Sequence, residues 1–72
     1  MEEKILSILR QVLGRNDIDW ECSQSNCDEW DSMNQLNLVV ELESEYGISL
    51  EPEEIAEMID CDSIKRILIS KK

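Results

Sequence analysis

The chain contains no histidine, and this absence limits the chemistry that its side chains can perform. A nucleophilic site that pairs serine or cysteine with a histidine base cannot be built from these residues. A length of 72 residues allows one small core and leaves little room for a buried active site. Together with the lack of a convergent group of reactive side chains, these features argue against an enzyme.

Basic residues are scarce as well. Only 7 Lys and Arg oppose 17 Asp and Glu, so the formal net charge is −10 at pH 7. Nucleic acids and anionic membrane surfaces both attract positively charged proteins, and neither is therefore an expected partner. The acidic excess favours partners with basic docking surfaces, although acid on a small protein also serves solubility alone.

Long apolar runs are also missing, so no segment is expected to cross a membrane. Residues 1–14 include Glu2, Glu3 and Lys4 and are typical of an amphipathic helix, not of a signal peptide. No internal repeat, low-complexity segment or linker divides the chain. We expect a single domain over residues 1–72, monomeric and located in the cytoplasm.

The cysteines do not form a pattern that predicts a disulfide framework or a metal centre. Cys22, Cys27 and Cys61 are an odd set, which favours free thiols. Zinc would need a fourth soft ligand that the chain does not offer. The acidic run of residues 17–21 lacks the glycine and the terminal bidentate acid of a calcium loop, so no metal site is expected beyond weak binding of divalent cations by carboxylates.

Hydrophobic periodicity predicts an all-α fold, a small four-helix bundle in which the third helix is short. The expected helices cover residues 2–13, 32–46, 53–59 and 63–69. Residues 15–31 form a long loop between the first two helices, which Ile18, Trp20 and Trp30 can anchor to the core. In the third helix, Ile55, Met58 and Ile59 are the apolar residues offered to the core, and Pro52 suits its start.

The helix over residues 32–46 has clear start and stop signals. Asp31 or Ser32 can serve as N-cap, and Ser32 with Gln35 fits a capping box. Gly47 stands where a left-handed residue ends a helix.

Two apolar stripes run along this helix, roughly 140° apart at 100° per residue. One is a normal core face, made of Leu38, Val39, Leu42 and Tyr46. The other consists of Met33, Leu36 and Val40, at the spacing of a helix that inserts anchors into a partner's groove. Flanking segments could instead cover this second stripe; we expect Met33 and Val40 to be exposed and leave Leu36 open.

From these features the sequence resembles the acyl carrier proteins over nearly its whole length, most strongly from Trp30 through Leu68. Asp31-Ser32-Met33 is similar to the Asp-Ser-Leu motif of that family, and residues 43–48 resemble the acidic, aromatic and glycine residues that close its second helix. The resemblance implies that Ser32 carries a 4′-phosphopantetheine group derived from coenzyme A. It also implies that Asp31 helps a phosphopantetheinyl transferase to engage the serine.

The resemblance further implies a surface for partner enzymes. Its apolar contacts would be Met33, Leu36 and Val40, and its acidic ones Glu41 and Glu43, with Glu45 beside them. The partners would be enzymes that activate or transfer acyl groups. Trp30, Asn34 and Asn37 depart from the fatty-acid carriers and favour a specialised biosynthetic pathway.

The expected function is therefore a carrier that holds acyl or aminoacyl intermediates as thioesters and presents them to other enzymes. A serine at a helix N-terminus suits a phosphodiester, because free N–H groups and the helix dipole attract the phosphate. The alternative is that Ser32 only caps the helix, in a carrier-like interaction module that is never modified. A second pair, Asp62-Ser63, precedes the last helix, and there the capping interpretation is preferred.

Overall fold

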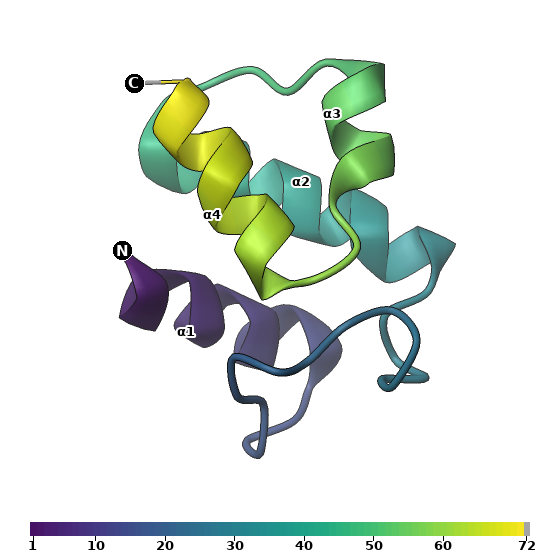
Figure 1. Cartoon of the computed structure of the whole chain (residues 1–72). Coiled ribbons are helices and arrows are strands. Elements are labelled where there is room, and N and C mark those ends of the chain that lie inside the picture. Colours follow the sequence, from purple (N-terminus) through teal and green to yellow (C-terminus); the bar gives the residue numbers. More distant parts are fainter. Residues whose placement is uncertain (72) are drawn as a thin grey trace.

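A computed structural model describes residues 1–71, and only Lys72 of the predicted 1–72 domain lies outside the described residues. It contains four helices: α1 (Glu2–Leu13), α2 (Ser32–Tyr46), α3 (Pro52–Glu57) and α4 (Cys61–Ser70). α1 packs against both α2 and α4, while the shorter α3 lies beside the first half of α2 (Figure 1). The predicted all-α bundle with a short third helix is confirmed.

The first two helices have the predicted bounds because their end signals are strong. Glycine follows each of them, Gly14 with φ 70° and Gly47 with φ 62°. This left-handed backbone favours glycine, and the N–H of each glycine donates to a carbonyl of the last helical turn. The ends of α2 are therefore well defined, and Ser32 is its first residue.

The last two helices differ from the prediction at their ends. α3 stops at Glu57, so Ile59 lies beyond the helix and is half exposed, and its expected place in the core is wrong. α4 begins at Cys61, two residues earlier than expected, because Asp60 is its N-cap and accepts from the backbone N–H of Ser63. The capping prediction had been based on the Asp62-Ser63 pair and did not consider Asp60.

A single core joins the helices and the long loop. Its most buried side chains come from α1, α2, α4 and the residue after α3: Ile5, Leu9, Leu38, Leu42, Met58, Cys61 and Ile64. The core face predicted for α2 is therefore confirmed, with Tyr46 packed at its margin. None of the described helices has both the length and the hydropathy needed to cross a membrane.

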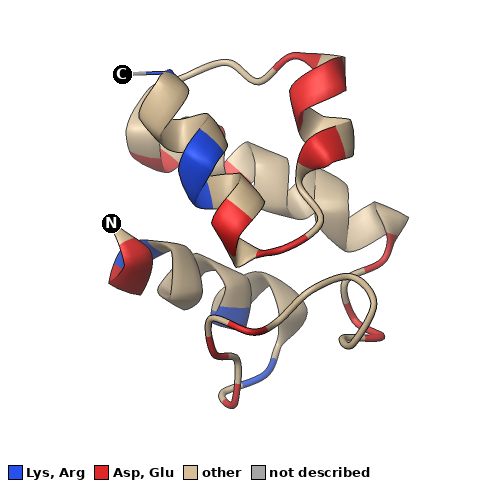
Figure 2. Cartoon of the chain, viewed as in Figure 1, with Lys and Arg blue, Asp and Glu red and all other residues tan. Residues whose placement is uncertain are grey.

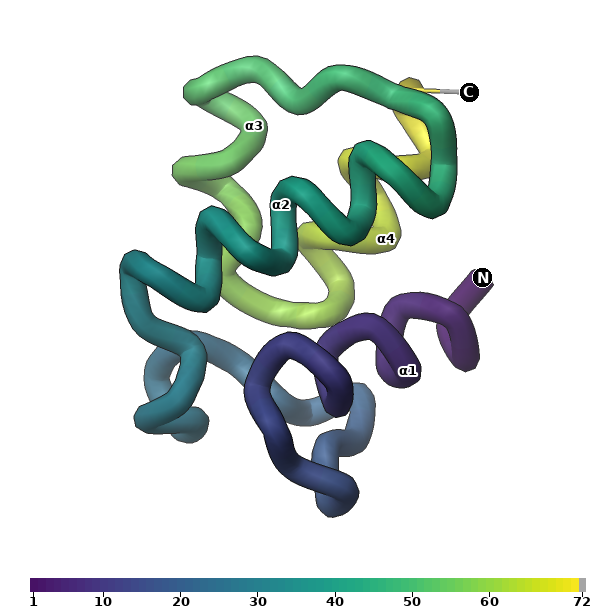
Figure 3. Tube along the Cα trace, turned by 180° about the vertical axis from the view of Figure 1, so that it is seen from behind, coloured from purple at the N-terminus to yellow at the C-terminus, as the bar shows by residue number. Residues whose placement is uncertain are grey.

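The loop between α1 and α2 is held in place by several contacts. Ile18 and Trp30 are buried in the core, as predicted, and Trp20 packs against it while its Nε1 donates to Asp62 Oδ1 at 2.7 Å. The backbone N–H of Gln24 donates to Ile59 O at 2.9 Å, so the loop also touches the link between α3 and α4. Figure 3 shows the loop passing from the end of α1 to the start of α2 at one end of the bundle. The loop that leads into α2 is thus held by contacts with the core and with the link between α3 and α4.

Candidate functional site

Ser32 is the first residue of α2 and is exposed. Asp31 is the N-cap, because its backbone is extended and its Oδ1 accepts from the backbone N–H of Asn34 at 2.9 Å. Within residues 1–71 no hydrogen-bond partner is present for the backbone N–H groups of Ser32 and Met33. An exposed hydroxyl therefore stands beside two free donors at the positive end of a helix dipole, which is a suitable place for a phosphodiester.

The predicted capping box of Ser32 with Gln35 is wrong. Because Asp31 is the cap, the position that could complete a box is Asn34, and Gln35 lies one residue further into the helix. Asn34 points elsewhere, with its Nδ2 donating to Glu29 O at 2.7 Å. The start of α2 is fixed by a single aspartate cap and by the loop before it.

Gln35 instead forms a buried polar bridge that sequence reasoning missed. Its Oε1 accepts from Trp30 Nε1 at 2.6 Å, and its Nε2 donates to Ile55 O at 2.8 Å and to Met58 O at 3.2 Å. The two carbonyls lie in the last turn of α3 and at Met58, the residue that follows it, and Ile55 O also accepts from the backbone N–H of Met58 at 3.1 Å. One amide thus ties the loop, α2 and α3 together.

A signal for this role was present in the sequence. Gln35 stands at i relative to Leu38 (i+3), Val39 (i+4) and Leu42 (i+7), which is the spacing of one helix face. A polar residue that continues a buried stripe needs partners for its polar atoms. Trp30, whose ring nitrogen needs an acceptor when buried, was the available candidate.

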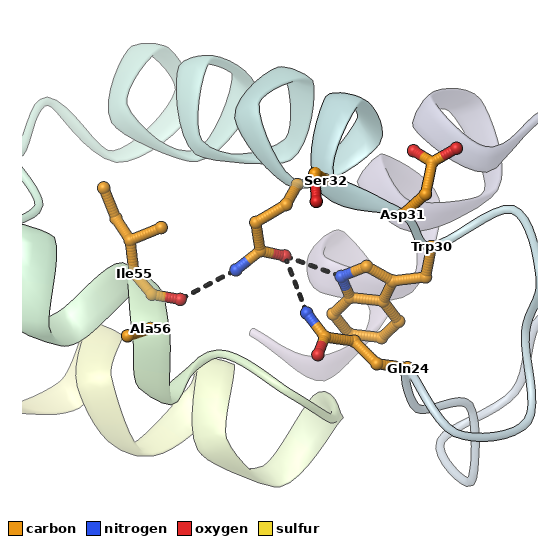
Figure 4. A pocket seen from close by; sticks show the side chains of 7 residues that line it. Gln24, Trp30, Asp31, Ser32, Ile55 and Ala56 are labelled. Atoms are coloured by element: carbon orange, nitrogen blue, oxygen red, sulfur yellow. Dashed lines mark hydrogen bonds between the residues drawn. The ribbon is translucent and has the colours of Figure 1, made fainter.

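A surface pocket of about 490 Å³ opens next to Ser32. Its remaining lining consists of Gln24, Trp30, Asp31, Gln35, Ile55 and Ala56. Figure 4 shows Trp30 and Gln24 on one side, Ile55 and Ala56 of α3 on the other, and Ser32 at the edge. The pocket is therefore an open groove between the loop, α2 and α3 beside the hydroxyl.

The second apolar stripe of α2 is exposed along its whole length. Met33, Leu36 and Val40 are 72%, 63% and 62% exposed, so neither a flanking helix nor the long loop covers them. The expected exposure of Met33 and Val40 is confirmed, and the open question of Leu36 is settled in favour of exposure. Three large apolar side chains in a row on a surface are typical of a contact site for another protein.

Acidic residues border this stripe and leave its start uncharged. Figure 2 shows the first half of α2 free of charged residues, with acid at its end and on α3. Of the predicted acidic contacts, Glu41 is exposed and, among the described residues, forms no ion pair. Glu43 accepts from the backbone N–H of Leu50 at 2.8 Å, and Glu45 pairs with Lys4 of α1 at 3.3 Å. Of these three acids, Glu41 is therefore the one whose carboxylate is not used to stabilise the fold.

The second aspartate–serine pair lies in a very different setting. Ser63 is buried, and its hydroxyl accepts from the backbone N–H groups of Ile59 and Asp60 while donating to Asp60 O. Its capping role is confirmed, with Asp60 and not Asp62 as the partner. A fully engaged hydroxyl inside the protein is not available for modification.

The cysteines and the acidic run of the loop have structural partners. All three cysteines are free and buried, as free thiols were expected to be. In the run, Arg15 holds Asp17 through two hydrogen bonds, which keeps the pKa of that carboxyl below its usual value. Within the described residues, no group of three or more Cys, Asp or Glu side chains is arranged to hold a metal ion.

Comparison with protein-family models matches residues 3–68 of the chain to the family described as "Phosphopantetheine attachment site". The match covers the long loop, α2 and α3 completely and most of α1 and α4. No curated protein matches the chain.

Proposed function

The chain belongs to the phosphopantetheine attachment family, and we propose on this basis that Ser32 is the residue that carries the group. Domains of this family are carriers, not catalysts, and bear 4′-phosphopantetheine as a covalent cofactor. The observation that carries the proposal is the setting of Ser32: an exposed hydroxyl at the first position of α2, beside two free backbone N–H groups. The residues present therefore fit a phosphodiester at this point.

The terminal thiol of the prosthetic group would hold an acyl or aminoacyl cargo as a thioester. The task of the protein is then to fix the attachment point and to be recognised. Trp30 and Gln35 hold the loop and α3 against α2, which fixes the direction in which Ser32 projects. The groove beside Ser32 gives the first part of the attached arm a surface to rest on.

Partner enzymes are recognised, in this proposal, through Met33, Leu36 and Val40, with Glu41 supplying charge. The transferase and the acyl-handling enzymes would place basic residues opposite the acid and an apolar groove opposite the stripe. Glu43 is less suited to this role because one oxygen of its carboxylate, Oε2, already accepts from the N–H of Leu50. Asp31 would contact the transferase in addition to capping α2.

We also propose a dedicated biosynthetic pathway. Asn34 and Asn37 leave the exposed start of α2 without charge, so a partner must rely more on apolar contact there. The presence of Trp30, by contrast, is explained by the fold, since its side chain is buried and donates a hydrogen bond to Gln35. A monomer in the cytoplasm completes the proposal, and three free thiols are in keeping with a reducing compartment.

The test is an intact-mass measurement on the full chain. The protein is incubated with coenzyme A and a phosphopantetheinyl transferase, beside Ser32→Ala and a control variant at another exposed serine of the same helix, Ser44→Ala. We expect the mass of one phosphopantetheine on the wild type and on Ser44→Ala, and none on Ser32→Ala. No gain with several transferases, or a gain that persists in Ser32→Ala, would refute the proposal.

The alternative function is an unmodified interaction module, which the exposed stripe of α2 supports by itself. Such a protein would bind partners through Met33, Leu36 and Val40 with Ser32 serving only as part of the helix start. The same measurement separates the two functions, because only the carrier accepts the group.

A further inference from the structure

Two thiols of the long loop lie in direct contact, away from Ser32. Cys22 Sγ and Cys27 Sγ are 2.8 Å apart, closer than the about 3.5–4.0 Å of ordinary non-bonded contacts between carbon atoms. The backbone accounts for this approach, since the N–H groups of Asn26 and Cys27 both donate to Ser23 O and close a turn between the cysteines. The contact is therefore part of how the loop folds.

We propose that Cys22 and Cys27 form a redox site, a dithiol that small-molecule disulfides oxidise to an intramolecular disulfide. A second pocket, of about 150 Å³, gives reagents a place to approach, because both cysteines line it together with Arg15. Cys61 is fully buried and is not among the residues that line this pocket. The site does not depend on modification of Ser32.

The two cysteines have different parts in the reaction. Burial raises the pKa of the Cys22 thiol to about 12, so it keeps its proton and Cys27 attacks first. Arg15 donates from Nη1 to Cys27 Sγ at 3.7 Å and places positive charge beside the attacking sulfur. Cys61 is fully buried and its Sγ donates to the carbonyls of Asp19 and Cys22, so a reagent does not reach this third thiol.

The exchange proceeds in two balanced steps. The Cys27 thiolate attacks one sulfur of the reagent, forms a mixed disulfide and releases one thiolate. Cys22 then attacks the Cys27 sulfur, which closes the protein disulfide, and its proton passes to the leaving sulfur of the reagent, which departs as the second thiol. The protein loses two electrons and two protons, and the reagent gains them as two thiols. Contact between the sulfurs favours the second step over attack by another reagent molecule.

Closure of this ring would fix the turn over residues 23–26. Gln24 in that turn lines the pocket at Ser32, and its Nε2 donates to Gln35 Oε1 at 3.5 Å. Its backbone is also bonded to Ile59. Oxidation would therefore stiffen one wall of the groove beside the attachment point, without a change in the helices.

The experiment uses the full chain without the prosthetic group, so that only its own thiols are counted. The reduced protein is incubated with glutathione disulfide, alkylated under denaturing conditions and cleaved after glutamate. Residues 22–29 then form one peptide that carries both cysteines and not Cys61. We expect this peptide to be unalkylated and lighter by two hydrogen atoms, while the peptide with Cys61 is alkylated.

Variants make the result specific. Cys61→Ser should still lose two thiols, whereas Cys22→Ser and Cys27→Ser should form no disulfide within the chain. The oxidised wild type should keep its helical circular dichroism and melt several degrees higher, because the ring restricts the unfolded chain. Retention of both thiols in the 22–29 peptide, a stable glutathione adduct, pairing with Cys61, or a lower melting temperature would each overturn the proposal.

Discussion

Ser32 and Ser63 make an instructive pair, because each follows an aspartate in sequence and each lies in the first turn of a helix. Ser32 directly follows its cap, Asp31, and its side chain is exposed. Ser63 is the third helical residue after its cap, Asp60, and its hydroxyl reaches back to the N–H of that cap. A serine at the first helical position therefore exposes its hydroxyl, whereas a serine at the third position uses its hydroxyl in the capping hydrogen bonds.

The difference shows that an Asp-Ser dipeptide does not by itself mark an attachment site. What matters is which aspartate caps the helix, since this decides where the serine stands in the first turn. Ser63 also lies against the core at 3% exposure, whereas Ser32 is exposed at the edge of a pocket. The predictions below test this contrast, from the largest effect to the smallest.

Removal of each hydroxyl should separate loading from stability. Ser32→Ala should abolish the gain of phosphopantetheine and leave the free energy of unfolding nearly unchanged. Ser63→Ala should keep loading, but should lower that free energy by about 1–3 kcal/mol, because the part-buried N–H of Asp60 loses its acceptor and the buried hydroxyl no longer joins Asp60 to Ile59. Denaturant unfolding followed by circular dichroism, beside intact mass, measures both quantities. Loading of Ser32→Ala, or an unaltered stability of Ser63→Ala, would break the comparison.

Disruption of the Gln35 bridge should destabilise the contacts that hold the loop and α3 against the start of α2. Gln35→Leu leaves the buried Trp30 N–H without its acceptor and removes one donor each from the carbonyls of Ile55 and Met58, and it should cost about 1–3 kcal/mol. Trp30→Phe removes the other end of the shortest bond. The double variant should cost less than the sum of the two single ones, since the residues are coupled. Additive losses in chemical denaturation would show that the bridge does not act as one unit.

The two aspartate caps should be alike in stability and unlike in loading. Replacement of Asp31 or Asp60 by alanine should cost about 1 kcal/mol in each case, and replacement by asparagine much less, because asparagine also caps. Only the Asp31→Asn variant should be loaded more slowly by the transferase, because this substitution removes the negative charge that the transferase would contact. Equal loading rates for Asp31→Asn and Asp60→Asn would contradict a role for Asp31 in recognition.

Charge reversal at the border of the apolar stripe should have the smallest effect. Glu41→Lys should slow loading severalfold at low salt and change stability by less than about 0.5 kcal/mol, as is usual for exposed residues. Glu53→Lys on α3 is a control with the same change in net charge. An equal loss in both variants would point to overall charge, and no loss at Glu41 would remove it from the docking surface.

The overall fold could be predicted from the sequence because its signals are local. Gly14 and Gly47 end two helices, and the apolar periods of α1 and α2 are unambiguous. The exposed stripe of α2 followed from the same periodicity, since three apolar residues fall outside the core face. Prediction was weaker for α3 and α4, where two aspartates, Asp60 and Asp62, are both available to cap one short helix and only tertiary packing selects Asp60.

The site was predicted at Ser32 but not in its surroundings. The Gln35 bridge joins residues up to 23 positions apart, and no local pattern specifies the carbonyl of Met58 as its partner. The contact of Cys22 with Cys27 depends on a turn within an irregular loop, which periodicity does not describe. The features that could not be predicted from the sequence were therefore the long-range polar contacts and the turns within the loop.

The most direct test of the attachment at Ser32 is the location of the added mass within the chain. After incubation with coenzyme A and transferase, cleavage after glutamate yields residues 30–41, in which Ser32 is the only serine, and residues 58–72, which carry Ser63. The account predicts phosphopantetheine on the 30–41 peptide alone. Its presence on the 58–72 peptide, or on any other serine, would contradict the assignment of Ser32.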